Sequence, residues 1–178
     1  MKEIETKLID FDEKEAEGIL EKKAVKVSDR IQRRWVFGIN DGKDGIDEFI
    51  RIRTDGVKTT LAYKYRKGTG LSNTEEIETE ISDFDVAADI FKKILPNCRY
   101  QENRRITYTY KSAEITVNYW PMVQPVIEIE AQQEDIINNI IAELGITATN
   151  KGNVGMARIC AEKGIDIRAY KELRLDTK

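Results

Sequence analysis

Charged side chains recur at every second residue in several short segments of this sequence. The rows are Glu3, Glu5 and Lys7; Arg51 and Arg53; Lys64 and Arg66; Glu76, Glu78 and Glu80; and Glu128 and Glu130. Residues two apart point to the same face of a β-strand, so each row lines one strand face with charge. Neighbouring like charges on a sheet face repel one another. The repetition of this cost in strand after strand indicates a common chemical task.

These rows have the composition needed to bind a polyanion together with a metal ion. The basic side chains, with Arg105 added, can bind phosphate oxygens, and each guanidinium can do so through two hydrogen bonds. Carboxylates are the ligands that Mg²⁺ and Mn²⁺ prefer. A divalent ion that bridges phosphate oxygens is therefore the chemistry these residues predict. The simpler explanation is a solvated sheet face, where single rows of charge are common.

The same segments carry apolar side chains on their other face. Alternation with a period of two predicts strands over residues 3–9, 49–53, 60–66, 76–81, 105–110, 114–119 and 126–130. Turn signals between them, such as Asp55-Gly56, fit antiparallel neighbours. Two arrangements satisfy the pattern: a flat sheet with a wet charged face, or a closed barrel whose charges point inward. The basic run 30–34 is predicted to be a solvated strand edge, although Arg30, Gln32 and Arg34 share a face and one of them could point into a barrel lumen.

Helices are predicted over residues 12–22, 83–95, 134–144 and about 153–163. Asp12 and Asp83 are suitable N-cap residues, Pro96 ends the second helix and Gly145 ends the third. A chain of 178 residues is the size of one domain. We therefore expect a single α+β domain over residues 1–178, with helices on the apolar outer faces of the strands.

Composition excludes several classes of function. With 29 basic and 32 acidic residues, the formal net charge is −3, which argues against a general nucleic-acid binder. The sequence has no histidine, so imidazole acid–base catalysis and His-based zinc sites are excluded. Cys98 and Cys160 are expected to be reduced thiols. Because no signal peptide or long apolar run is present, a cytoplasmic protein with no membrane association is predicted.

The segment EIETK at 3–7 resembles the ExExK signature of the CYTH, or triphosphate tunnel metalloenzyme, superfamily. Further segments follow in the order found in that family, and together they cover essentially the whole chain. They are FIRIR with Arg51 and Arg53, LAYKYR with Lys64, EEIETEI with Glu78, RRITY with Arg105, and VIEIE with Glu128 and Glu130.

The resemblance implies an eight-stranded antiparallel closed β-barrel that forms a tunnel, with helices packed on its outside. It also implies an enzyme that acts on a small molecule containing a triphosphate, with Mg²⁺ or Mn²⁺. By position, the metal ligands would be Glu3, Glu5, Glu128 and Glu130. The substrate-binding residues would be Lys7, Arg51, Arg53, Lys64, Arg66 and Arg105. Lys7, Arg53 and Glu78 are the candidate catalytic residues.

Three functions remain open on the sequence. Metal-dependent hydrolysis of inorganic, nucleoside or thiamine triphosphate comes first, because no base-recognition pocket is visible in the sequence. A class IV adenylyl cyclase, which makes cyclic AMP and pyrophosphate from ATP, is the alternative. A module that binds triphosphate or polyphosphate with little turnover is the third, because Asn103 and Asn118 stand where many family members have Lys and Asp. The protein is expected to be a monomer or a homodimer.

Overall fold

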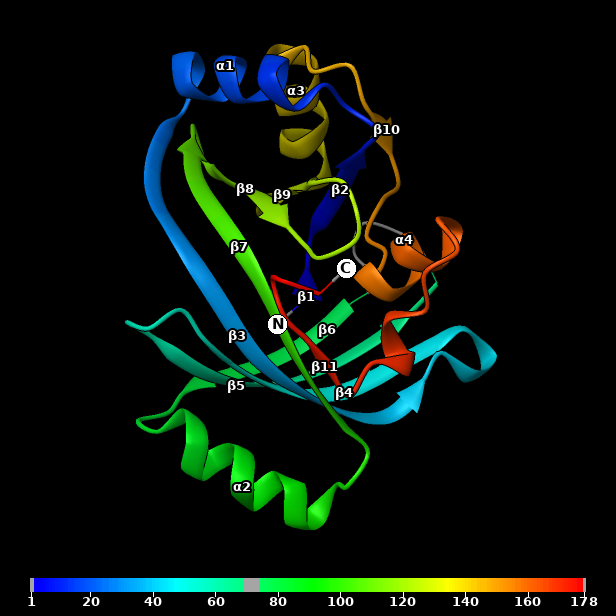
Figure 1. Ribbon diagram of the computed structural model, residues 1–178. Coiled ribbons are helices and arrows are strands. Elements are labelled where there is room, and N and C mark those ends of the chain that lie inside the picture. Colours follow the sequence, from blue (N-terminus) through cyan, green and yellow to red (C-terminus); the bar gives the residue numbers. More distant parts are fainter. Residues whose placement is uncertain (1, 69–73, 178) are drawn as a thin grey trace.

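The computed structural model describes residues 2–68 and 74–177, and it shows an α+β chain built on one strongly curled sheet (Figure 1). The strands are β1 (Lys2–Glu3), β2 (Glu5–Ile9), β3 (Val25–Asp41), β4 (Ile46–Thr54), β5 (Thr59–Lys67), β6 (Thr74–Glu80), β7 (Cys98–Tyr110), β8 (Ala113–Tyr119), β9 (Val126–Glu130), β10 (Thr149–Asn150) and β11 (Glu172–Leu173). The helices are α1 (Glu13–Lys23), α2 (Phe84–Ile94), α3 (Glu134–Leu144) and α4 (Met156–Glu162), with the short 3₁₀ turns η1 (Lys43–Gly45) and η2 (Ile167–Ala169).

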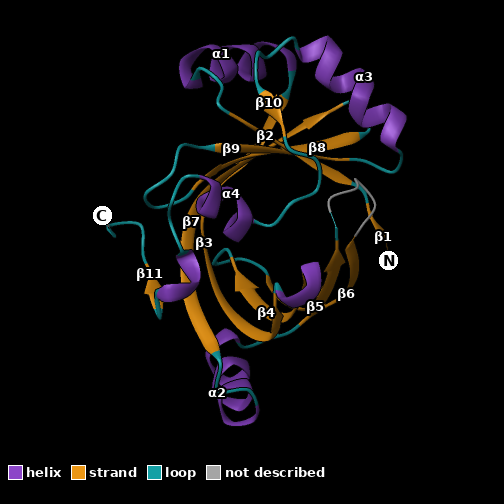
Figure 2. Cartoon of the chain, turned by 90° about the vertical axis from the view of Figure 1, so that its right-hand side faces the viewer, coloured by secondary structure: helices purple, strands orange, loops and turns teal. Residues whose placement is uncertain are grey.

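The sheet curls so far that the N-terminal segment contacts both of its ends. The order of hydrogen-bonded strands is β1-β6-β5-β4-β3-β7-β8-β9-β2-β10, and β11 pairs with β7. β1 pairs with β6, whereas β2, which follows after Ile4, pairs with β9. All pairings in this order are antiparallel, as the turn signals predicted. Figure 2 shows the strands arranged around a central space. The predicted closure into an eight-stranded barrel remains a prediction.

The predicted strands and helices are present, but one long strand was missed. β3 spans 17 residues and pairs with both β4 and β7. Its first half has no buried apolar face, since Val25, Val27 and Ile31 are exposed. β7 likewise begins at Cys98 rather than at residue 105, because its first half pairs with β3. The prediction of a mere strand edge at residues 30–34 is therefore wrong: this stretch lies inside the sheet.

The hydrophobic core lies on the convex face of the sheet, where helices cover it. The larger cluster packs α1 and α3 against one half of the sheet, and it includes Leu8, Leu20, Ile115, Ile129 and Ile137. A second cluster packs Phe84 and Ala88 of α2 against Phe37 and Ile52. Because these apolar side chains are buried between the helices and the convex face of the sheet, the charged faces of the same strands point inward. This arrangement confirms the predicted position of the helices.

The C-terminal segment lies across one opening of the curled sheet (Figure 2). It is held by a small cluster in which Trp120 packs with Cys160, Ile167 and Leu173. Cys98 and Cys160 are both free, as expected. Over the described ranges, the helices are too short or too polar to cross a membrane.

Helix α2 should depend on its N-cap. The carboxylate of Asp83 accepts a hydrogen bond of 2.9 Å from the backbone N–H of Val86. Because this bond satisfies a helix N–H that otherwise lacks a partner, Asp83→Ala should lower the free energy of unfolding by about 1 kcal/mol. Urea denaturation measures the change. Asp85→Ala, which removes a charge from the same turn but no cap, is the control, and an equal loss in both variants would contradict the role of Asp83.

Candidate functional site

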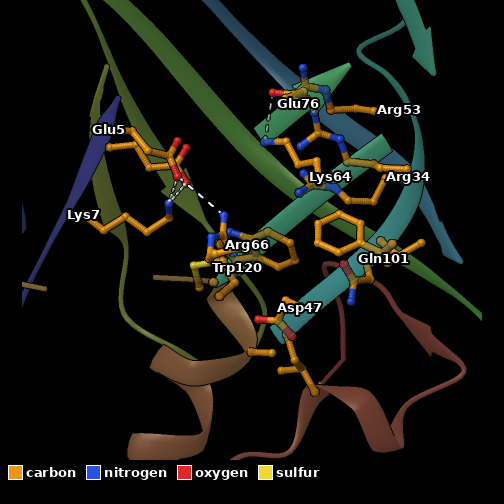
Figure 3. Close-up of a pocket in the computed structure, with 18 of the residues that line it drawn as sticks. Glu5, Lys7, Arg34, Asp47, Arg53, Lys64, Arg66, Glu76, Gln101 and Trp120 are labelled. Atoms are coloured by element: carbon orange, nitrogen blue, oxygen red, sulfur yellow. Dashed lines mark hydrogen bonds and ion pairs between the residues drawn. The ribbon is translucent and has the colours of Figure 1, made fainter. Parts of the chain in front are cut away.

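The curled sheet encloses a cavity of about 290 Å³ whose wall is mostly charged (Figure 3). The predicted site residues that line it are Glu5, Lys7, Arg51, Arg53, Lys64, Arg66, Glu76, Glu78, Arg105, Glu128 and Glu130. Glu80 does not line the cavity; its side chain is 71% exposed and pairs with Lys58. Glu3 lies in β1, but its side chain is outside the described part of the structure. The charged rows thus meet at one site.

Sequence reasoning missed part of the cavity wall. The added residues come from β3, from the first half of β4, from the first half of β7, from β8 and the residue after it, and from the C-terminal segment. They include Arg34, Asp41, Asp47, Phe49, Arg99, Gln101, Glu114, Trp120, Met156 and Arg168. In the sheet register Arg34 lies opposite both Arg53 and Gln101. The shared face of Arg30, Gln32 and Arg34 was the one available signal for this part of the wall.

At one side of the cavity, Lys7 joins two carboxylates from neighbouring strands. Its ammonium lies 2.6 Å from Glu5 and 3.3 Å from Glu128. Burial alone would lower the pKa of Lys7, but the charges of Glu5 and Glu128 outweigh burial and raise it. For Glu128, burial would raise the pKa, whereas the charges of Lys7 and Arg105 lower it well below its usual range. Lys7 and Glu128 are therefore charged near neutral pH.

At the other side of the cavity, several guanidinium groups lie close together, and the carboxylates near them are too few to pair with each one. Arg51 pairs with Glu76 at 3.0 Å and with Glu78 at 3.2 Å, and Arg53 lies 3.6 Å from Glu78. The charge of Arg51, burial, and the charge of Arg105 together lower the pKa of Arg53 to about 9. Arginine stays protonated in proteins, so a depressed pKa measures how unfavourable its charge is in that place. An anion bound there would relieve this cost.

Arg34 is the most extreme member of this group. Burial, followed by the charges of Arg105, Arg53 and Arg51, holds its pKa well below the usual value. Its guanidinium stacks on Trp120 at 4.5 Å and donates a hydrogen bond to Asn103. The buried Nε atom makes no hydrogen bond, and no carboxylate among residues 2–68 and 74–177 forms an ion pair with this side chain. A buried, unpaired guanidinium is costly and calls for an anionic ligand.

Asn103 and Asn118 form a buried hydrogen-bonded pair between the two sides of the cavity. The amide of Asn103 donates to Asn118 Oδ1 at 3.2 Å, and Arg105 Nε donates to the same oxygen at 2.7 Å. Asn118 in turn donates to Glu128 at 3.2 Å. Arg104 does not supply the charge of the lysine that the family resemblance places at position 103. Its side chain lies on the other face of β7 and pairs with Asp29. The two amides thus provide hydrogen bonds without charge.

Carboxylates from three adjacent strands face one another at the acidic side. In the register, Glu5 lies opposite Glu130, and Glu130 lies opposite Glu114. Such an all-oxygen set suits a hard divalent ion such as Mg²⁺ or Mn²⁺. Over the described residues, however, the acidic side chains do not gather in a group of three or more that could hold an ion. The donor chemistry fits a metal, while Glu5 and Glu128 currently pair with cations.

The C-terminal segment is fastened to the rim of the cavity by charge. Arg168 of η2 forms an ion pair with Asp47 of β4. Within the sheet, Asp41 of β3 pairs with Arg99 of β7 at 2.5 Å. Gly155 lies directly against Arg66: a Cβ atom at this position would be 2.8 Å from the Nη1 atom of Arg66. The glycine therefore permits α4 to begin at the cavity wall.

No family model matches the sequence, and no curated protein sequence matches it. Among solved structures, the chain is similar to PH1819 from Pyrococcus horikoshii OT3, with a TM-score of 0.70 and 19% identity over 90% of this chain and 99% of that one. It is also similar to HpAC1 from Hippeastrum, a candidate adenylyl cyclase with a dominant triphosphatase activity, with a TM-score of 0.63 and 15% identity over 94% and 99% of the two chains. A candidate adenylate cyclase from Bacillus halodurans gives a TM-score of 0.58 and 14% identity over 89% and 96%.

These likenesses show that the chain shares the fold of these proteins. The identities are too low to transfer an activity, because proteins of one fold can carry different chemistry. Function must therefore be argued from the cavity itself.

The unpaired charge of Arg34 predicts that anions stabilise this protein. Inorganic pyrophosphate at 100 times its dissociation constant should stabilise the fold by about 2.7 kcal/mol. Arg34→Met should weaken this affinity at least tenfold, because it removes one charge-assisted contact. Thermal unfolding at matched ionic strength, with sodium chloride as the reference salt, measures both effects. Arg104→Met, which removes an arginine outside the cavity, is the control; equal stabilisation of the wild type and Arg34→Met would contradict the assignment.

Proposed function

We propose that this protein is a divalent-metal-dependent hydrolase that acts on a triphosphate bound inside the curled sheet. The observation that carries the proposal is the crowding of buried guanidinium groups around Arg34 and Arg53. The pKa of Arg34 is lowered by burial and then by its neighbouring arginines, and the pKa of Arg53 is lowered by the charge of Arg51 and then by burial. A chain of phosphates supplies several negative charges along a line, which is the complement of such a wall. A single carboxylate ligand would neutralise only one of these cations.

The proposed clamp uses the basic side chains according to their geometry. Arg34, Arg51, Arg53 and Arg105 can each bind phosphate oxygens through two N–H groups, whereas Lys7, Lys64 and Arg66 add charge from β2 and β5. These residues come from five strands, so the phosphates would be contacted from several sides. The pairing of β1 with β6 and of β2 with β9 supports a tunnel closed through the N-terminal segment.

Glu5, Glu128 and Glu130, with Glu3 and the adjacent Glu114, are the proposed holders of Mg²⁺ or Mn²⁺. A divalent ion bound to phosphate oxygens would neutralise charge that develops at the phosphorus. In this proposal a bound triphosphate forms ion pairs with Lys7 and Arg105. In the structure these two cations pair with Glu5 and Glu128 instead. The carboxylates are then free to accept a metal.

Hydrolysis would proceed by attack of water on the terminal phosphorus and loss of the remaining diphosphate. Arg53 and Lys7 would hold the negative charge of the transition state. Glu78 is the proposed group that orients the water, because its side chain is 30% exposed and reaches Arg51 and Arg53 from β6. The protein would thus contribute position and charge, and no covalent intermediate on the enzyme is required.

Two other functions are favoured by specific observations. The likeness to candidate adenylate cyclases supports cyclisation of ATP, in which the ribose 3′-hydroxyl would attack the α-phosphorus and pyrophosphate would leave. The neutral pair Asn103 and Asn118, together with the ion pairs of Glu5 and Glu128, supports binding of triphosphate without turnover. Both use the same clamp, so only the products separate them.

The deciding experiment is to incubate the protein with inorganic triphosphate, ATP or thiamine triphosphate and Mg²⁺ or Mn²⁺. Orthophosphate and cyclic AMP are measured together with the dissociation constant of each ligand. Orthophosphate release supports the hydrolase, whereas cyclic AMP with pyrophosphate supports the cyclase. Binding without either product supports the binding module, and absence of binding to every triphosphate would overturn the clamp.

Removal of one clamp residue should weaken substrate binding. Arg53→Met should raise KM for the preferred triphosphate at least tenfold, because a charge-assisted contact to phosphate is lost. Steady-state kinetics at fixed metal concentration provide the measurement. Lys58→Met removes an exposed cation from the neighbouring loop and is the matched control. An unchanged KM in Arg53→Met would remove this residue from the clamp.

Removal of a metal-holding carboxylate should abolish turnover but retain the fold. Glu5→Gln and Glu130→Gln should each lower kcat at least a hundredfold, and the apparent metal affinity should fall. The comparison variant is Glu80→Gln, which belongs to an acidic row but lies outside the cavity. Near wild-type kcat in both cavity variants, with unchanged metal dependence, would show that these carboxylates do not hold the ion.

A further inference from the structure

Helix α2 has a second apolar face besides the one that packs on the sheet. Phe84 and Ala88 are buried against the convex face of the sheet. Val86, Ile90 and Ile94 follow one another at intervals of four residues, so they form a stripe along another side of the helix. Each of the three is more than half exposed, and among the described residues the core clusters include none of them. A helix that packs by one face normally has polar residues on the rest of its surface.

The sheet face that α2 covers also carries an exposed apolar residue. Ile77 of β6 is 72% exposed. It points away from the cavity, because its neighbours Glu76 and Glu78 line the cavity wall. In the register it lies opposite Tyr63 of β5, which is only partly buried. Figures 1 and 2 show α2 at the opposite end of the molecule from α1 and α3. The exposed apolar residues of this end therefore lie far from the two helices that cover the larger core cluster.

The charges beside the stripe are divided about its midpoint at Ile90. Asp85 and Asp89 precede the midpoint, and Lys92 and Lys93 follow it. Asp89 and Lys93 are both exposed and lie four residues apart, so they share one flank of the stripe. Asp89 pairs with Lys92 at 3.0 Å, whereas Lys93 forms no ion pair within the part of the chain that the structure describes. A stripe that is acidic at one end and basic at the other is complementary to a second copy of itself in the opposite direction.

We propose that a second copy of this chain covers the stripe, with the two α2 helices antiparallel about a twofold axis at Ile90. In this arrangement Ile90 packs on the same residue of the second copy, and Val86 packs on Ile94. The axis places Asp89 of each copy beside Lys93 of the other, so two ion pairs form on the same side of the contact. Burial of the two stripes drives association, and the ion pairs select the antiparallel direction.

This inference goes beyond the proposed function and does not depend on it. The stripe lies on the outside of the sheet, whereas the phosphate-binding residues line the cavity inside. The contact is also small, because two helices of 11 residues are short compared with a standard interface of about 1,600 Å². The dimer should therefore be reversible and dissociate on dilution.

The first test measures association by sedimentation velocity over an about hundredfold range of protein concentration. The wild type should change from monomer to dimer as the concentration rises. Ile90→Glu places two carboxylates next to each other on the axis, so it should raise the dissociation constant of the dimer about tenfold or more. Val25→Glu introduces the same charge at an exposed valine of β3 and is the control. Circular dichroism verifies that both variants keep the fold.

An exchange of charges tests the antiparallel direction. Asp89→Lys and Lys93→Asp should each raise the dissociation constant about threefold or more, because each variant brings like charges together twice. The double variant Asp89→Lys/Lys93→Asp should return to the wild-type value, because both ion pairs form again with the charges reversed. A parallel arrangement would place each residue beside its own copy and would not show this recovery.

The outcomes decide the inference without any substrate. A dimer that is weakened in Ile90→Glu, kept in Val25→Glu and recovered in the double variant supports the antiparallel contact. A monomer at every concentration would overturn it, and so would a dimer with the same dissociation constant in the wild type and Ile90→Glu. Failure of the double variant to recover would overturn the antiparallel direction. Each of these results leaves the proposed function untouched.

Discussion

The structure depends on placing charged side chains inside a curled sheet. Each charge that leaves water loses solvation free energy, and only a nearby opposite charge or hydrogen bond compensates for it. Lys7 with Glu5 and Glu128 is balanced in this way. Arg34 is not, because it has a neutral amide and an aromatic ring as its neighbours. The fold thus carries an electrostatic deficit that a ligand of several negative charges would remove.

This constraint explains how the other layers are arranged. Strands that point charge inward must point their apolar residues outward, so α1, α2 and α3 pack on the outside of the sheet. Strong curling also leaves the sheet ends close together, where β1 and β2 contact them from one N-terminal segment. The C-terminal segment, finally, covers an opening through which buried charges would otherwise face bulk water. Ion pairs such as Arg168 with Asp47 hold it there.

Much of this could be predicted from the sequence, because alternation of charged and apolar residues is a local property. The rows in β2, β4, β5 and β9 and the capped helices were found in this way. β3 was missed because partners on both sides, not its own pattern, stabilise it. Because Arg34 lies on β3, its place in the cavity wall was missed as well. Glu80 shows the opposite error: it has the right parity, but it lies at the end of β6, where the side chain reaches solvent and Lys58.

Asn103 and Asn118 show why binding and turnover have different requirements in this cavity. Replacing a Lys and Asp pair by two amides removes one cation and one anion, so the net charge that attracts a polyanion is unchanged. The hydrogen bonds from Arg34 through both amides to Glu128 persist, and they hold the arginines in place. What is lost is a carboxylate that could bind a metal or accept a proton. Under the proposed function, the arginines that would bind phosphates therefore keep their places, while catalysis would rely on the carboxylates of β2, β6, β8 and β9.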